Sequence, residues 1–153
     1  MKKFKFRFQA VEKLRRLEME FQVKEVALAE RKVLEIESQI EDRERKLREE
    51  ILRLKQIDLS EIRNEVLKAL SSNYREELRR QVKKLKFDAL NAKAEVIRER
   101  RKLVEKQKKL RAMEVLEEKD KERYYAELNR LETQELDEIS SNFWIHNSRA
   151  DIE

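Results

Sequence analysis

The sequence predicts an all-α fold, a long antiparallel two-helix coiled coil with a short helix or turn at its tip. Three observations carry this prediction. The 153 residues include no glycine, proline or cysteine, so every position is compatible with helix and tight-turn chemistry is almost absent. Charged residues make up 46% and apolar residues 39%, which is typical of helices that bury one narrow stripe. Apolar residues also recur at seven-residue steps in both halves.

The first long helix is predicted at about 5–57, within a single helical hairpin over 1–153. Its opening, "KKFKFRF", alternates basic residues with aromatics in a way that resembles a strand. Nothing later in the chain offers a strand to pair with it. If the helix begins early, Phe4 and Phe8 lie on one helical stripe with Val11 and Leu14, and Phe6 is an additional aromatic.

A coiled-coil seam follows along this first helix. Apolar residues recur at seven-residue steps at Val26, Val33, Ile40, Leu47 and Leu54. Leu14, Phe21 and Leu28 keep the same period on a shifted frame. The shift predicts a small phase slip between Leu28 and Val33.

The chain is predicted to reverse at a tip over 58–73. Asp58 with Glu61, and Asn73 with Glu76, each resemble a capping box at a helix start. Between them lies a short amphipathic pattern, formed by Leu59, Ile62, Val66 and Leu70. The alternative is one unbroken helix in which the two capping patterns are incidental.

The second long helix is predicted at about 74–141 and the tail at 142–153. Its seam also steps by seven and consists of Val82, Ala89, Val96, Leu103, Leu110, Tyr124 and Leu131. Companion positions are Leu78, Leu85, Ala92 and Met113. In the tail, Phe143, Trp144 and Ile145 are consecutive, so they cannot share one helix face.

The charge distribution favours pairing of the two seams within one chain. Residues 1–24 carry 8 basic and 3 acidic side chains, and 25–74 carry 10 and 12. Residues 75–111 carry 15 and 6, and 112–153 carry 5 and 12. A hairpin reversed at 58–73 places basic beside acidic segments along its length, whereas a parallel dimer in register stacks the strongly basic third segment on itself.

The composition excludes several classes of function. Phosphate-cradling loops need glycine, and the chain has none, so we expect no nucleotide site of that kind. The absence of cysteine and the single His146 argue against thiol nucleophiles and metal sites. Adjacent carboxylates such as Glu49 and Glu50 are typical of a solvated helix face. We therefore predict no enzyme activity and no cofactor, and the lack of a long apolar run predicts no signal peptide and no membrane insertion.

The C-terminal stretch "RERRKLVEKQKKLRAMEVLEEKDKERYYAELNRLETQELDEIS" resembles the FliJ family of flagellar type III export proteins. The family's last helix typically ends in an acidic "LDE" motif, which here is Leu136, Asp137 and Glu138. The opening "KFKFRFQAVEKLRRLEMEFQ" is similar to the aromatic, basic start of the family.

This resemblance implies a cytoplasmic coiled-coil stalk at the cytoplasmic face of the membrane export apparatus. Its implied partners are the hexameric export ATPase and the membrane export-gate protein, with a link to cycling of export chaperones. One hypothetical partner surface comprises the terminal aromatics and the acidic motif: Phe4, Phe6, Phe8, Leu136, Asp137, Glu138, Phe143 and Trp144. The other is the tip: Leu59, Ile62, Val66, Leu70 and Tyr74.

Two alternatives stay open at the level of sequence. The first is the equivalent stalk of a virulence type III secretion system. The second is a generic coiled-coil scaffold or a nucleic-acid-associated protein that uses the basic segment 75–111. Against nucleic acid, this segment contains Phe87 as its only aromatic, with Tyr74 adjacent, and it contains no nucleic-acid motif.

Overall fold

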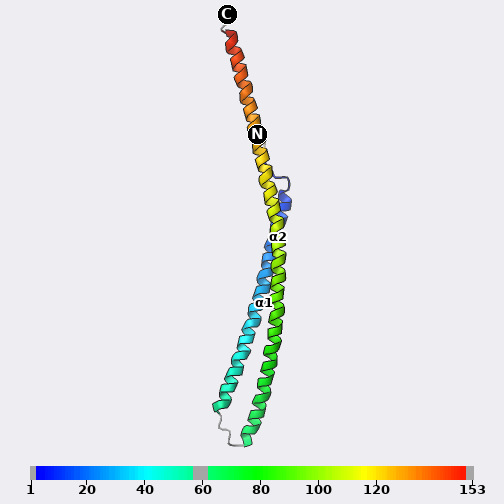
Figure 1. Ribbon diagram of the computed structural model, residues 1–153, viewed down its shortest axis with the longest axis vertical. Coiled ribbons are helices and arrows are strands. Elements are labelled where there is room, and N and C mark those ends of the chain that lie inside the picture. The colour runs from blue at the N-terminus through cyan, green and yellow to red at the C-terminus, as the bar shows by residue number, and fades with distance from the viewer. Residues whose placement is uncertain (1–2, 57–61, 151–153) are drawn as a thin grey trace. The chain divides into compact units, whose positions relative to one another are not determined.

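The computed structural model describes residues 3–56 and 62–150, and it describes side chains over 3–56 and 65–145. This part of the chain contains two helices and no strand: α1 is Gln9–Gln56 and α2 is Ile62–Ala150 (Figure 1). The fold class is all-α, as predicted. The chain divides into two compact units, unit 1 comprising residues 1–18 and 107–153, and unit 2 comprising 19–106. Each is described by itself.

The observed helix ends differ from the predicted ones. α1 begins at Gln9 rather than near residue 5, with Glu12 in its first turn, and ends with Arg53 and Lys55, charges that complement the helix dipole. α2 runs without a break through Asn73 and through 142–150, so over 62–150 there is neither a separate tip helix nor a non-helical tail. Helix propagation is favourable once nucleated, and no glycine or proline interrupts it. Asp58, Leu59 and Glu61 lie outside the described residues.

Unit 2 is built on a seam between α1 and α2. Its buried apolar side chains are Val26 on α1 and, on α2, Leu78, Val82, Ala89, Ala92 and Val96. The α2 positions are spaced by four, seven, three and four residues, as in a heptad repeat. They coincide with the predicted seam and its companion row. On α1 the predicted residues from Val33 to Leu54 are half-buried along the same line.

The predicted phase slip on α1 is wrong. Leu14, Phe21 and Leu28 are all more than half exposed, and the buried positions in this region are Gln22 and Val26. The amide Nε2 of Gln22 donates to the Glu99 carboxylate at 2.6 Å and to the Glu99 carbonyl at 3.1 Å. A buried amide is tolerated when it is paired in this way, and a polar pair within a seam favours one register over others.

A ladder of ion pairs flanks the seam of unit 2. Glu30 lies 2.5 Å from Arg100, Glu37 lies 2.7 Å from Lys93, and Glu44 lies 2.9 Å from Lys86. From one pair to the next, the residue number increases by seven on α1 and decreases by seven on α2, so the two helices are antiparallel here. This confirms that the acidic face of the first helix lies beside the basic face of the second. Each pair is exposed, so the ladder selects register more than it stabilises.

Acidification is expected to weaken unit 2. The hydrogen bond from Lys86, followed by its charge, holds the pKa of Glu44 below its ordinary value of 4.5. The folded chain therefore binds this proton less readily than the unfolded chain. The contribution of Glu44 is complete above its ordinary pKa and is lost as pH falls through the lowered pKa.

We expect the midpoint of urea unfolding, followed by circular dichroism, to fall between about pH 6 and about pH 3. The Glu44→Gln variant removes the titrating group, so its urea midpoint should fall by less than that of the wild type over this pH interval. Equal losses in the two proteins would contradict a contribution from this pair.

Unit 1 joins the N-terminal residues to the C-terminal part of α2. Residues 3–8 precede α1 and are not helical, and the backbone N–H of Gln9 donates to the Phe6 carbonyl at 3.4 Å. Leu110 of α2 is buried in this unit, and Tyr124 is half-buried. The alternating opening is therefore not the helical stripe that the sequence predicted. In a non-helical segment, alternate residues can turn toward the same neighbour, which suits Phe4 and Phe6.

Candidate functional site

The N-terminal aromatics lie in unit 1, and Phe4 packs against α2. The Phe4 ring lies 5.6 Å from the Tyr124 ring, and the Lys121 ammonium lies 5.8 Å from the Phe4 ring centroid. Phe6 is only 5% exposed and contacts the Phe8 ring edge-on at 5.9 Å. Phe4 thus attaches the N-terminus to α2, and Phe6 is buried within the same unit. Of the three predicted aromatics, Phe8 is the most exposed.

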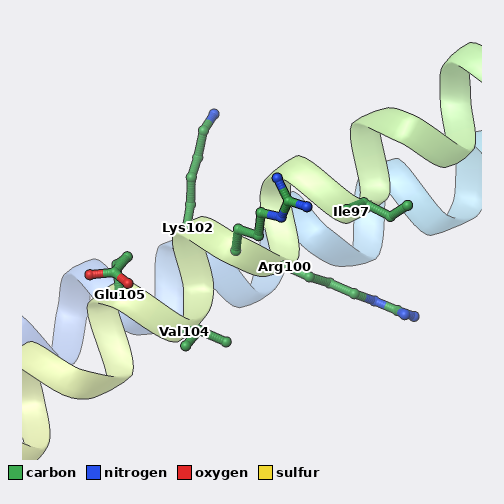
Figure 2. Close-up of a pocket in the computed structure, with 6 residues that line it drawn as sticks. Ile97, Arg100, Lys102, Val104 and Glu105 are labelled. Atoms are coloured by element: carbon green, nitrogen blue, oxygen red, sulfur yellow. The ribbon is translucent and has the colours of Figure 1, made fainter.

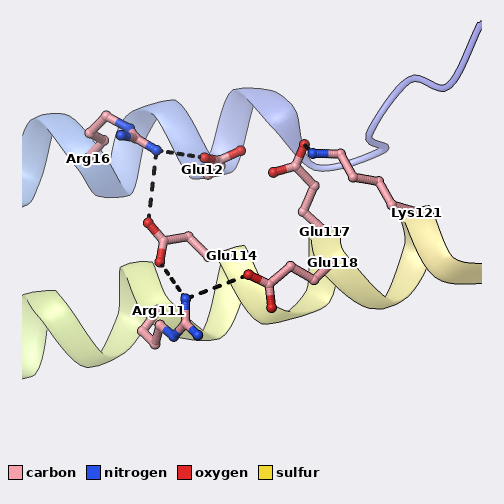
Figure 3. Close-up of polar contacts among 7 residues, drawn as sticks. All are labelled: Glu12, Arg16, Arg111, Glu114, Glu117, Glu118 and Lys121. Atoms are coloured by element: carbon pink, nitrogen blue, oxygen red, sulfur yellow. Dashed lines mark hydrogen bonds and ion pairs between the residues drawn. The ribbon is translucent and has the colours of Figure 1, made fainter.

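An ion-pair network continues from this cluster along unit 1 (Figure 3). Arg16 lies 2.9 Å from Glu12 and 4.0 Å from Glu114. Arg111 lies 3.2 Å from the same Glu114 carboxylate and 3.8 Å from Glu118. The charge arrangement is opposite to that of unit 2, with a basic side chain on α1 and an acidic one on α2. This confirms that the basic start lies beside the acidic end.

The same network includes the lysine that covers Phe4. Lys121 lies 2.9 Å from Glu117, and this hydrogen bond is the main cause that raises the pKa of Lys121. Glu12 adds to the effect through its charge. The ammonium therefore keeps its charge across the physiological range, and it places a positive charge beside the Phe4 ring.

The C-terminal part of α2 is the most exposed segment in unit 1. Every residue from 131 to 145 is exposed, including the predicted seam residue Leu131, so the seam does not extend this far. Leu136, Ile139 and Phe143 follow helical spacing and form one apolar stripe on an acidic helix, with Asp137 and Glu138 beside it. Trp144 is 72% exposed next to this stripe.

The structure does not bring the two sets of terminal aromatics together. Phe4 contacts Tyr124, whereas Phe143 lies 19 residues further along α2, which is about 28 Å at the helical rise. Any partner that binds Phe143 and Trp144 can therefore do so without contacting Phe4 or Phe6. The side chain of His146 lies outside the described residues.

The tip residues that the structure describes form an exposed face at the start of α2. Val66, Leu70 and Tyr74 are 63%, 60% and 47% exposed. Leu59 and the side chain of Ile62 lie outside the described residues. Nearby, the Ser71 hydroxyl donates to the Glu50 carboxylate, and both residues are buried. The end of α1 is thus tied to α2, while the apolar face of α2 remains open.

Two features are absent from the residues that the structure describes: a cluster of metal-ligating side chains and a membrane-spanning stretch. Over 3–56 and 62–150, no group of three or more His, Cys, Asp or Glu side chains is placed to hold a metal ion. Neither helix, over the same ranges, contains an apolar stretch of the length that a membrane crossing requires. The candidate sites that the structure describes are the exposed apolar stripe of 131–145 and the exposed face at the start of α2.

Sequence reasoning missed one apolar surface. Leu90, Ile97 and Val104 of α2 are exposed, and Leu34 of α1 lines a pocket together with Ile97. The signal was present, because Leu90, Ile97 and Val104 are seven residues apart. It is a second heptad row beside the seam row, and periodicity alone does not distinguish the two.

Comparison with known proteins gives one finding. The family model described as "Flagellar FliJ protein" matches residues 4–149. No curated protein and no solved structure matches the chain. The match spans nearly the whole sequence, from the N-terminal aromatics through both helices to the exposed acidic end of α2. The chain therefore belongs to the flagellar FliJ protein family.

Proposed function

We propose that this chain is a non-enzymatic component of the flagellar protein export apparatus that binds the hexameric export ATPase and couples it to the membrane export gate. Family membership supports a role in flagellar export. The observation that carries the binding proposal is the segment 131–145 of α2, in which every residue is exposed and Leu136, Ile139 and Phe143 form one stripe. Large apolar side chains of this kind are the usual anchors of protein interfaces.

The C-terminal segment is suited to enter a partner for a physical reason. An isolated helix is only marginally stable in water, and this one keeps a continuous apolar stripe exposed. Docking would bury the stripe, and Asp137 and Glu138 beside it would select basic positions on the partner. The chain would act allosterically, because binding favours those ring conformations that accept the helix best.

The tip face of α2 is the second part of the proposal. Val66, Leu70 and Tyr74 are exposed in unit 2, far along α2 in sequence from the C-terminal stripe. We assign this face to the export-gate protein, so that one helix carries separate surfaces for two partners. Export chaperones would exchange on the same protein. The location would be cytoplasmic, peripheral to the membrane.

The experiment that tests the proposal is a titration of the purified chain into the cognate export ATPase. The rate of ATP hydrolysis should rise and saturate near a single chain per hexamer, with co-migration in light scattering. The chain alone should hydrolyse no ATP. Absence of both stimulation and co-migration would overturn the proposal. Salt-sensitive binding to nucleic acid without an effect on the ATPase would favour the alternative of a nucleic-acid-associated protein.

A further inference from the structure

Unit 2 carries a second apolar surface that its own fold does not use. We call it the lateral face and define it by Leu34 of α1 and Leu90, Ile97 and Val104 of α2. These four side chains are between 46% and 67% exposed. Leu34 and Ile97 line one pocket together with the ladder residues Glu30, Lys93 and Arg100. Ile97 and Val104 line a second pocket beside it (Figure 2).

The spacing of the lateral face fits a helix as its occupant. A two-helix pair needs one seam on each helix, and in unit 2 that seam is already formed by residues such as Leu78, Val82 and Val96. A second row at seven-residue steps is the pattern of a helix that packs against two neighbours. Leu34 extends the surface onto α1, so a third helix could lie against both.

The charge of the lateral face indicates the sign of the charge that its occupant should carry. The second pocket is lined by Arg100, Arg101, Lys102 and one carboxylate, Glu105. Arg100 is paired with Glu30, and Lys102 with Glu99. Arg101 has no ion pair within the described residues. Lys83 lies one heptad step before Leu90, so it extends the row of Leu90, Ile97 and Val104 with a positive charge. The face is therefore apolar along its middle with positive charge available beside it.

We propose that the lateral face binds an acidic amphipathic helix of a partner protein. Apolar residues of the partner at heptad spacing would pack on Leu34, Ile97 and Val104, and its flanking carboxylates would face Arg101 and Lys83. A second copy of this chain is disfavoured, because two lateral faces brought together would oppose like charges. The site lies within residues 19–106 and is independent of the C-terminal docking proposed above.

The probe is a labelled synthetic helix of about four heptads with leucine at the seam positions and glutamate at the flanking ones. A twin peptide carries lysine in place of glutamate. Fluorescence anisotropy with the full chain should show binding of the acidic peptide and binding at least about tenfold weaker for the basic twin, or ~1.4 kcal/mol. Equal affinities for the two peptides would overturn the proposal.

Matched variants locate the site. The Leu34→Ser, Ile97→Ser double variant should weaken binding of the acidic peptide about tenfold. Leu28→Ser should leave the affinity within about twofold, since Leu28 is 59% exposed on α1, close to the 66% of Leu34, but lines neither pocket. Arg101→Glu should weaken binding and Lys84→Glu, the same charge change at an exposed position outside the pockets, should not.

Two outcomes contradict the proposal directly. If the peptide displaces α1 from the seam, binding will be insensitive to Ile97→Ser and Arg101→Glu while circular dichroism keeps all variants folded. If light scattering shows a dimer of the chain alone that Ile97→Ser abolishes, the face is occupied by a second copy. Neither measurement involves the ATPase, so this proposal and the proposed function can fail separately.

Discussion

Replacing Leu78 with alanine is expected to lower the free energy of unfolding by about 2–5 kcal/mol. Leu78 is 3% exposed and is the most buried apolar side chain of the unit 2 seam. Truncation removes apolar area from the seam and leaves a cavity that two rigid helices cannot easily close. Alanine is a better helix former than leucine, so lost packing is the only cost.

Leu90→Ala provides the matched control for this experiment. It is the same substitution on the same helix, but Leu90 is 67% exposed and lies on the lateral face. Its effect on unfolding should stay within about 0.5 kcal/mol. Urea unfolding followed by circular dichroism measures both variants. Comparable losses would mean that the row containing Leu90 belongs to the core and would remove the basis for the lateral face.

The fold class was predictable from sequence because apolar residues at heptad spacing in both halves of the chain indicate two long helices that pair along a seam. Val82, Ala89 and Val96 lie at the predicted seam of α2 and are buried. The charge segments also predicted which faces meet, and the pairs Glu37 with Lys93 and Arg16 with Glu114 follow that prediction. Such patterns repeat along the chain, so no single position decides the outcome.

The errors occurred where one residue depends on a distant partner. Phe21 and Leu28 were predicted to be core residues, but they are exposed, and the neighbouring Gln22 is buried because its amide is paired with Glu99 of the other helix. The residues near Gln22 in sequence do not predict that hydrogen bond, because its partner is 77 residues away. Asn73 likewise looked like a helix start, and cooperative propagation of α2 through it prevailed over its local capping pattern.

The candidate sites were predicted less completely for the same reason. Phe143 and Phe6 look alike as aromatics near chain ends, yet Phe6 is buried against its own unit and Phe143 is exposed. The difference arises because the N-terminal residues find α2 to pack on, whereas every residue of 131–145 is exposed. Composition identified aromatics as candidates but did not show which of them the fold would use.

The Phe143→Ala, Trp144→Ala double variant is expected to bind the export ATPase roughly 30-fold more weakly, a loss of about 2 kcal/mol or more in binding free energy. Both side chains are exposed, at 68% and 72%, so the helical content and the unfolding midpoint should stay unchanged. Affinity is measured by biolayer interferometry on the ATPase, and stimulation of ATP hydrolysis should decline in parallel.

A variant at the tip tests whether binding to the ATPase and binding to the export gate use separate surfaces of α2. Val66→Ser with Leu70→Ser changes two exposed apolar residues on α2 that are far in sequence from Phe143. It should keep ATPase association and weaken binding to the cytoplasmic domain of the export gate, whereas the C-terminal variant should do the reverse.

If both variants affect both partners equally, α2 does not carry separate surfaces. If the C-terminal variant binds the ATPase as wild type does, the aromatic end is not the docking site. Because both variants leave the seam intact, either result would report on recognition rather than on folding.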